Sequence, residues 1–125
     1  GHSDADVLAH AVSDALLGAV RGGDIGKLFP DTDPAYKDAD SLKLLAEVAR
    51  FVRERGFEII DVDSVIAAQA PKLSPYREAM RENLAAAMGV PVENVGVKAT
   101  TTEHLGHEGR EEGITAYATC LVCRI

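Results

Sequence analysis

Apolar residues between Asp6 and Val20 recur every three or four positions, which is the spacing of one face of an α-helix. Two later segments repeat this period, one starting at Ser41, which can cap a helix, and one at Ser74-Pro75. Strands are expected at residues 57–60, 62–68, 95–100 and 114–124. Three helices and about four strands that do not strictly alternate predict an α+β two-layer sandwich, in which the helices cover one face of a single sheet.

Glycines are expected at the ends of these helices. Gly22 and Gly23 are expected to end the first helix, and Gly56 and Gly89 lie where the next two should stop. Residues 23–34 are dense in Gly, Pro and Asp and lack periodicity, which predicts a long loop. Long ordered loops in small domains are often functional.

The chain has the size and composition of one compact domain, residues 1–125, with 46% hydrophobic and 26% charged residues. Its 13 Lys and Arg against 20 Asp and Glu give a formal net charge of -7, and it has no Trp. Both features disfavour nucleic-acid binding. No apolar run is long enough to cross a bilayer and residues 1–4 do not resemble a signal peptide, so we expect a cytoplasmic protein. Because Met is absent from the start, we do not expect Gly1 to begin the gene product.

Cys120 and Cys123 have the C-x-x-C spacing of some redox and zinc motifs. They lie in a β-rich run, where positions three apart point to opposite faces of a strand. We therefore expect two buried thiols and no metal site.

Asp6, His10 and Asp14 are spaced four apart, so their side chains project from one stripe of the first helix. Such a stripe can bind a cation, or it can be a solvated row of charges, and the spacing alone favours the solvated row. His2 and Ser3, just ahead of the expected helix, offer groups that suit an anion.

Two further segments carry polar groups suited to phosphate. Residues 68–74 turn from a strand into a helix with Lys72 beside the exposed amides, although an ordinary turn with a solvated lysine would look the same. Residues 98–103 contain consecutive threonines followed by Glu103, which can hold a divalent cation, and Arg110 can pair with an anion. No nucleophile, base and acid form a recognisable triad.

Together, segments 2–10, 24–33, 68–72 and 98–106 resemble the 2-C-methyl-D-erythritol 2,4-cyclodiphosphate synthase family, in order and along the whole chain. The resemblance implies a homotrimer with sites at its subunit interfaces and a cytidine diphosphate-linked substrate. In that family the 2-phosphate of 4-diphosphocytidyl-2-C-methyl-D-erythritol 2-phosphate attacks the β-phosphorus and expels CMP, in the non-mevalonate pathway to isoprenoids. The substrate supplies its own nucleophile, which fits the missing triad.

The resemblance also implies metal and catalytic roles for particular residues. His10 matches a zinc ligand, and Glu103 matches the ligand of a second ion, Mg2+ or Mn2+. Two other zinc ligands belong to an upstream Asp-x-His strand that is absent from this sequence, and we expect Asp6 and Asp14 to orient His10 or bind solvent instead. His2 and Thr101 match residues that act on the transferring phosphates.

Substrate contacts are implied in the same way. The matching positions are Ser3, Asp24, Gly26, Phe29, Asp33, Ala68, Lys72, Leu73, Thr100, Thr101 and Arg110. Residues 68–74 with the two threonines match the cytidine pocket, while Asp24 and Gly26 match ribose and erythritol contacts and residues 29–33 lie on a loop over the substrate.

The chain departs from the family near Arg110, which matches a residue of the central channel that binds isoprenoid diphosphates in some members. His107 stands where many members have Phe, and Glu111 where Gly is usual, so the sequence does not establish this channel function. A non-catalytic nucleotide-binding module with the same fold is the competing interpretation. The presence of His10, Lys72, Thr101 and Glu103 together argues against that alternative, since a module that only binds has no need of both metal positions.

Overall fold

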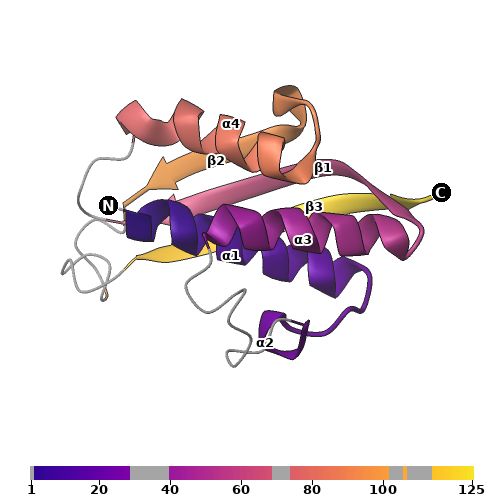
Figure 1. Cartoon of the computed structure of the whole chain (residues 1–125). Helices are drawn as coiled ribbons and strands as arrows, with labels where there is room; N and C mark the ends of the chain where they lie inside the picture. Colours follow the sequence, from indigo (N-terminus) through magenta and orange to yellow (C-terminus); the bar gives the residue numbers. More distant parts are fainter. Residues whose placement is uncertain (1, 29–39, 69–73, 102–105, 107–113) are drawn as a thin grey trace.

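The computed structural model describes residues 2–28, 40–68, 74–101, 106 and 114–125 (Figure 1). Within them the elements follow the order α1 (His2–Ala19), α2 (Ile25–Leu28), α3 (Ser41–Glu54), β1 (Phe57–Ala67), a 3-10 turn (Ser74–Tyr76), α4 (Arg77–Met88), a 3-10 turn (Val92–Asn94), β2 (Val95–Thr100) and β3 (Thr115–Arg124). The predicted α+β class is confirmed. None of the helices in these ranges is long and apolar enough to cross a membrane.

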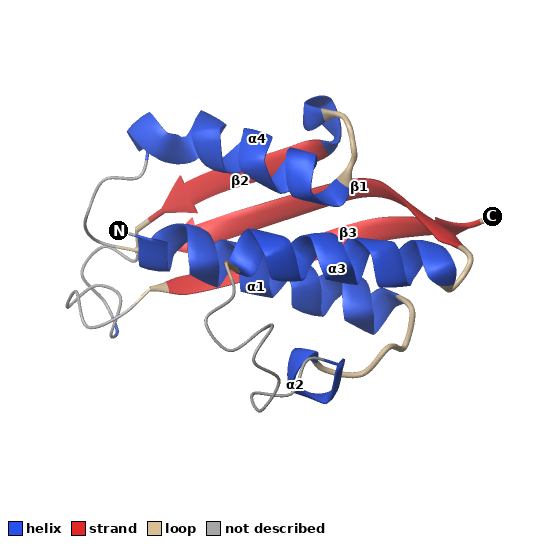
Figure 2. Ribbon diagram, viewed as in Figure 1, coloured by secondary structure: helices blue, strands red, loops and turns tan. Residues whose placement is uncertain are grey.

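The sheet of the described residues has three strands in the order β2-β1-β3 rather than the expected four or so. β1 is parallel to β2 and antiparallel to β3 (Figure 2). Residues 57–60 and 62–68, expected as separate strands, belong to the single strand β1. The register against β3 shifts between Ile59 and Asp61, which is the signature of a β-bulge at Ile60. The bulge adds one residue to β1 and so interrupts the alternation of buried and exposed positions. In the sequence this interruption looks like the end of one strand and the start of another.

Three helices, α1, α3 and α4, cover one face of this sheet, as predicted (Figure 1). Between them and the sheet lies a core of aliphatic side chains and methionines, in which Leu8, Leu16, Leu45, Ile66 and Met88 are fully buried. The short helix α2 is an addition, since the sequence predicted only loop between residues 23 and 34. It packs beside α1.

On the other face of the sheet, large apolar side chains are exposed to solvent. Tyr117 is 64% exposed, Leu121 59% and Ile60 40%. On β3 these positions alternate with Ala118 and Cys120, which pack against the core. One face of β3 therefore completes the core, while the other has no helix over it among the described residues.

Two helix ends differ from the sequence prediction. α3 is capped by Asp40, whose side chain accepts a hydrogen bond from the Leu42 N–H at 2.8 Å, so Ser41 is the first helical residue and not the cap. After α1 the left-handed residue is Arg21, with φ 57°, and Gly22 N–H then bonds to the Leu17 carbonyl at 2.9 Å. That pattern is a Schellman motif, in which Gly is more usual at the left-handed position. Gly56 and Gly89, with φ of 90° and 69°, end α3 and α4 as expected.

The two cysteines are free and lie on opposite faces of β3. Cys120 is half-buried, with Sγ 3.4 Å from the Ala15 carbonyl oxygen, and burial raises its pKa. Cys123 is exposed, so the prediction of two buried thiols is wrong for this residue. The alternation of a strand places every third residue on the opposite side, and only one of the two sides has helices packed on it.

Candidate active site

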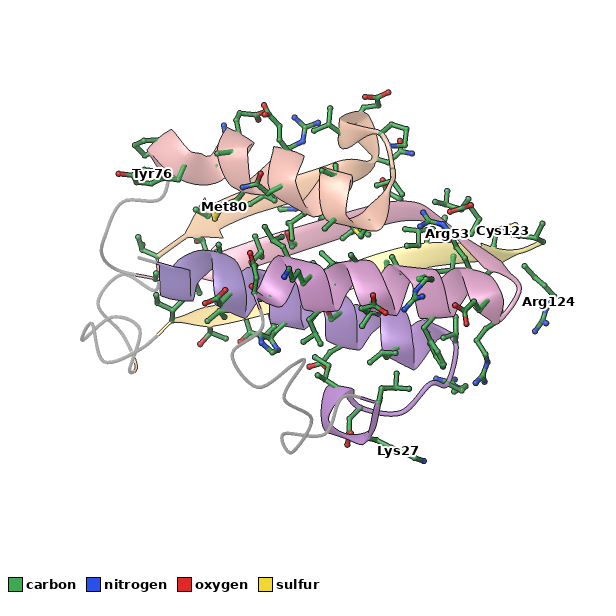
Figure 3. The ribbon with its side chains drawn as sticks, in the orientation of Figure 1. Lys27, Arg53, Tyr76, Met80, Cys123 and Arg124 are labelled. Atoms are coloured by element: carbon green, nitrogen blue, oxygen red, sulfur yellow. The ribbon has the colours of Figure 1, made fainter. Side chains whose placement is uncertain are left out.

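All three long helices begin at the end of the sheet at which β1 and β2 finish (Figure 2). Because β1 and β2 are parallel, with Ala67 paired to Thr100, their carboxyl ends meet at one edge. Figure 3 places the exposed Tyr76, next to the start of α4, at this same end. Helix starts present unpaired N–H groups and a partial positive charge, so this end of the molecule suits an anionic ligand.

Ala68 and Thr100, predicted to share the cytidine pocket, are in contact. The Ala68 N–H donates to the Thr100 carbonyl at 3.0 Å, which extends the pairing one residue beyond β1. Ala68 is buried, whereas Thr100 and Thr101 are exposed. The Thr100 hydroxyl donates to the Thr101 carbonyl at 3.2 Å. Two exposed threonine side chains therefore lie beside a paired strand end.

The first helix starts at His2, four residues earlier than the sequence indicated. His2, Ser3 and Asp4 are thus the opening turn of α1 and do not precede it. The first N–H groups of a helix have no partner within it, so the expected anion-binding character remains with these residues as part of the helix. The longer helix also joins His2 and His10 within one rigid element.

His10 and Asp14 are exposed on α1, one turn apart. Asp6 is half-buried, and its Oδ1 accepts a hydrogen bond from the hydroxyl of Ser41 at 2.5 Å. This bond was missed by the sequence interpretation, which expected Asp6 to orient His10 or bind solvent. No sequence signal points to it, because the two residues are 35 positions apart and Ser41 was assigned as a helix cap.

A zinc ion requires about three protein ligands at a catalytic site. His10 fits as one of them, because its imidazole is exposed on a regular helix. Among the described residues, however, no group of three His, Cys, Asp or Glu side chains is close enough to hold a metal. The described part of the chain therefore offers one residue that fits a zinc ligand and not a complete set.

Asp24 and Gly26 are placed away from the strand ends. Asp24 Oδ1 accepts from the Lys27 N–H at 2.8 Å and so starts α2, in which Gly26 lies. Figure 1 shows α2 beside α1, apart from the ends of β1 and β2. The structure thus brings Ala68, Thr100 and Thr101 together, but not Asp24 and Gly26 with them in one chain. Six other predicted site residues lie outside the described residues: Phe29, Asp33, Lys72, Leu73, Glu103 and Arg110.

A groove of about 460 Å³ is lined by residues of the first turns of α4 and of the strands β1 and β2. Its walls include Arg77, Arg81, Asp63 and Lys98, and it contains none of the predicted site residues. The Arg81 side chain donates to the Val95 carbonyl at 2.6 Å, and the Lys98 ammonium bonds both carboxylate oxygens of Asp63. Arg81 also pairs with Glu78, as Lys98 does with Asp63, and the groove is distinct from the strand-end site.

The comparisons with known proteins match nearly the whole chain. The model of the YgbB family matches residues 1–123. A curated relative from Desulfitobacterium hafniense (strain DSM 10664 / DCB-2), named 2-C-methyl-D-erythritol 2,4-cyclodiphosphate synthase, is 60% identical over 98% of this chain and 78% of its own length. The chain thus spans about three quarters of that relative.

Solved structures agree. The bifunctional IspDF from Campylobacter jejuni aligns with a TM-score of 0.89 and 44% identity, over 95% of this chain and 32% of that protein. A CDP complex of IspF from Plasmodium falciparum aligns with a TM-score of 0.82 and 28% identity, over 94% of this chain and 70% of that one. On this family match and these identities, the chain belongs to the YgbB family, whose matched curated relatives are 2-C-methyl-D-erythritol 2,4-cyclodiphosphate synthases.

Proposed function

We propose that residues 1–125 form one cyclodiphosphate synthase domain. The domain converts 4-diphosphocytidyl-2-C-methyl-D-erythritol 2-phosphate to 2-C-methyl-D-erythritol 2,4-cyclodiphosphate and CMP. The observation that carries this proposal is 60% identity to an enzyme of that name over nearly the whole chain. The strand-end site, with two exposed hydroxyls beside the helix starts, supports it independently.

In this reaction an oxygen of the substrate's 2-phosphate forms a bond to the β-phosphorus. The bond from that phosphorus to the bridging oxygen breaks, and the electron pair leaves with CMP. The protein's task is therefore to fold the substrate and to neutralise its phosphates. No covalent bond between substrate and enzyme is needed. Residues 68–74 with Thr100 hold the cytidine end, and Thr101 and His2 contact the phosphates that react.

The metal ions complete this scheme. Together with further ligands, His10 would hold Zn2+, and Glu103 would hold Mg2+ or Mn2+. Bound there, each ion would draw charge from the phosphate oxygens as a Lewis acid. The exposed position of His10 on α1 supports its part, whereas Glu103 lies outside the described residues.

We further propose that three copies assemble through the open face of the sheet. Exposed apolar side chains such as Tyr117 and Leu121 would be covered there. An assembly also resolves the separation of Asp24 and Gly26 from Ala68 and Thr100, because the two groups can meet across a subunit boundary. Each site would then combine Ser3, Phe29, Asp33 and their neighbours on one subunit with Lys72, Leu73 and theirs on the next.

The test is phosphorus NMR of the products made by the full-length natural protein. We expect CMP and a cyclic diphosphate in equal amounts, formed only when a divalent cation is present. His10→Ala should lower kcat at least about 100-fold, the upper range for lost metal-site interactions. CMP with a linear diphosphate would show hydrolysis and overturn the assignment. Binding of CMP without any product would favour the non-catalytic module.

A further inference from the structure

The hydrogen bond between Ser41 and Asp6 joins the first residue of α3 to the second turn of α1, and these two helices pack side by side. Ser41 is 5% exposed, and its hydroxyl donates to Asp6 Oδ1 at 2.5 Å. A hydrogen bond to a charged carboxylate is roughly twice as strong as a neutral one, and low hydration strengthens it further. The bond therefore fixes α3 to α1 at one defined point.

This point lies in the middle of the functional stripe of α1, the row formed by His2, Asp6 and His10. Asp6 follows His2 by one step of four residues and precedes His10 by another. Residues four apart lie about one turn apart on a helix, so Asp6 is one turn from the position of each histidine along α1. Any rotation or sliding of α1 that moved the histidines would also stretch the bond to Ser41.

The hydroxyl of Ser41 is not the N-terminal cap of α3. Capping is done by Asp40, which accepts from the Leu42 N–H. Ser13 provides a contrast on α1, because it is fully buried and its hydroxyl has no hydrogen-bond partner in the part of the chain that the structure describes. A buried serine is thus tolerated in this core without a bond, whereas Ser41 makes one directly to the stripe.

We propose that Asp6 and Ser41 are positioning residues that hold His2 and His10 in register for the phosphoryl transfer. This inference rests on the proposed function. Ser41 acts on the reaction through Asp6 and α1, and neither it nor Asp6 ligates the zinc ion. A misplacement of about 1 Å can cost up to 100-fold in rate, so a single interhelical bond is sufficient to matter.

The experiment compares Ser41→Ala with Ser13→Ala in the full-length natural protein. Both variants remove one hydroxyl from a buried serine, but only the first breaks a bond. For Ser41→Ala we expect kcat to fall about tenfold and zinc affinity, measured by chelator competition, to fall about tenfold as well. The affinity for CMP should stay unchanged, because Ala68 and Thr100 lie on other elements. Ser13→Ala should change none of the three, and Ser41→Thr should restore kcat by returning the hydroxyl.

The inference is overturned if Ser41→Ala matches Ser13→Ala in kcat and zinc affinity. Equal losses of zinc and CMP affinity, together with a lower melting temperature, would also overturn it by showing general loosening. If Ser41→Ala does not fold, Asp6→Asn weakens the same bond and is measured in the same three ways. A wild-type protein that makes no cyclic product would refute the proposed function, and the zinc comparison would still decide whether Ser41 positions His10.

Discussion

Glu58, near the start of β1, is a carboxyl held by two donors. Its Oε1 accepts from the Ile59 N–H at 2.9 Å and from Arg53 Nε at 3.0 Å. The backbone bond, helped by Arg53, lowers the pKa of Glu58 below its ordinary value of 4.5, against a smaller opposing effect of burial. A lowered pKa in the folded state means that the ionised form stabilises the fold.

We expect Glu58→Gln to reduce the free energy of unfolding at pH 7 by at most about 0.5 kcal/mol, since the side chain is 44% exposed and solvent screens it. The stabilisation by Glu58 is present above pH 4.5 and is lost as the pH falls through the folded-state pKa. The difference between variant and wild type should therefore vanish in acid. Urea unfolding at pH 7 and below pH 4 measures it, and an equal difference at both pH values would contradict the interpretation.

Helix ends show which parts of an element follow from sequence. The positions after α3 and α4 hold Gly56 and Gly89, and both adopt the left-handed conformation that glycine tolerates best. After α1 the left-handed residue is Arg21 although Gly22 is adjacent. A Cβ on Gly22 would lie 2.6 Å from the Phe51 ring, so this glycine is required for packing between two helices and not for the turn. Composition locates the helix end, but only the tertiary contact decides which residue turns.

The strands and the candidate site also depend on tertiary contacts that the local sequence does not reveal. The segment 95–100 was predicted with its observed bounds, but the bulge at Ile60 split β1 in the prediction because pairing with β3 is not encoded locally. At the site, the resemblance assigned Ala68 and Thr100 to one pocket, and in the structure the Ala68 N–H donates to the Thr100 carbonyl, one residue beyond the paired part of β1. The bond from Ser41 to Asp6 could not be foreseen, because each residue has an adequate local explanation within its own helix.

One glycine within a helix and one at the end of a helix allow a matched test. Gly89→Ala forces a left-handed alanine and should destabilise the protein by about 1 kcal/mol. Gly18→Ala lies within α1, where nothing approaches its Cβ within 4 Å, and should stabilise the protein by about 0.5–1 kcal/mol. Urea denaturation gives both values. Changes of the same sign would show that backbone conformation does not govern these two sites.

The open sheet face determines how whole molecules meet in the proposed trimer. Leu121, 59% exposed at the middle of β3, would be covered on assembly, so Leu121→Lys would bury a charge without a partner. We expect this variant to shift the mass measured by light scattering from trimer to monomer and to lose activity, because each site would be left half complete. Glu82→Lys, on the exposed side of α4, is the control and should remain trimeric. A trimeric Leu121→Lys protein would place the interface elsewhere.

The position of β3 also bears on when the molecule can fold. β3 pairs with the central strand β1 and packs against α1, yet it is synthesised long after both. While the chain is being made, the apolar side of α1 has no complete sheet to cover it, and one edge of β1 remains unpaired. Pairing of segments so distant in sequence is slow, and exposed apolar surface during that time favours aggregation. Folding on the ribosome should therefore finish only after residues 115–124 have emerged, and until then the nascent chain should be a substrate for chaperones that bind exposed apolar helices.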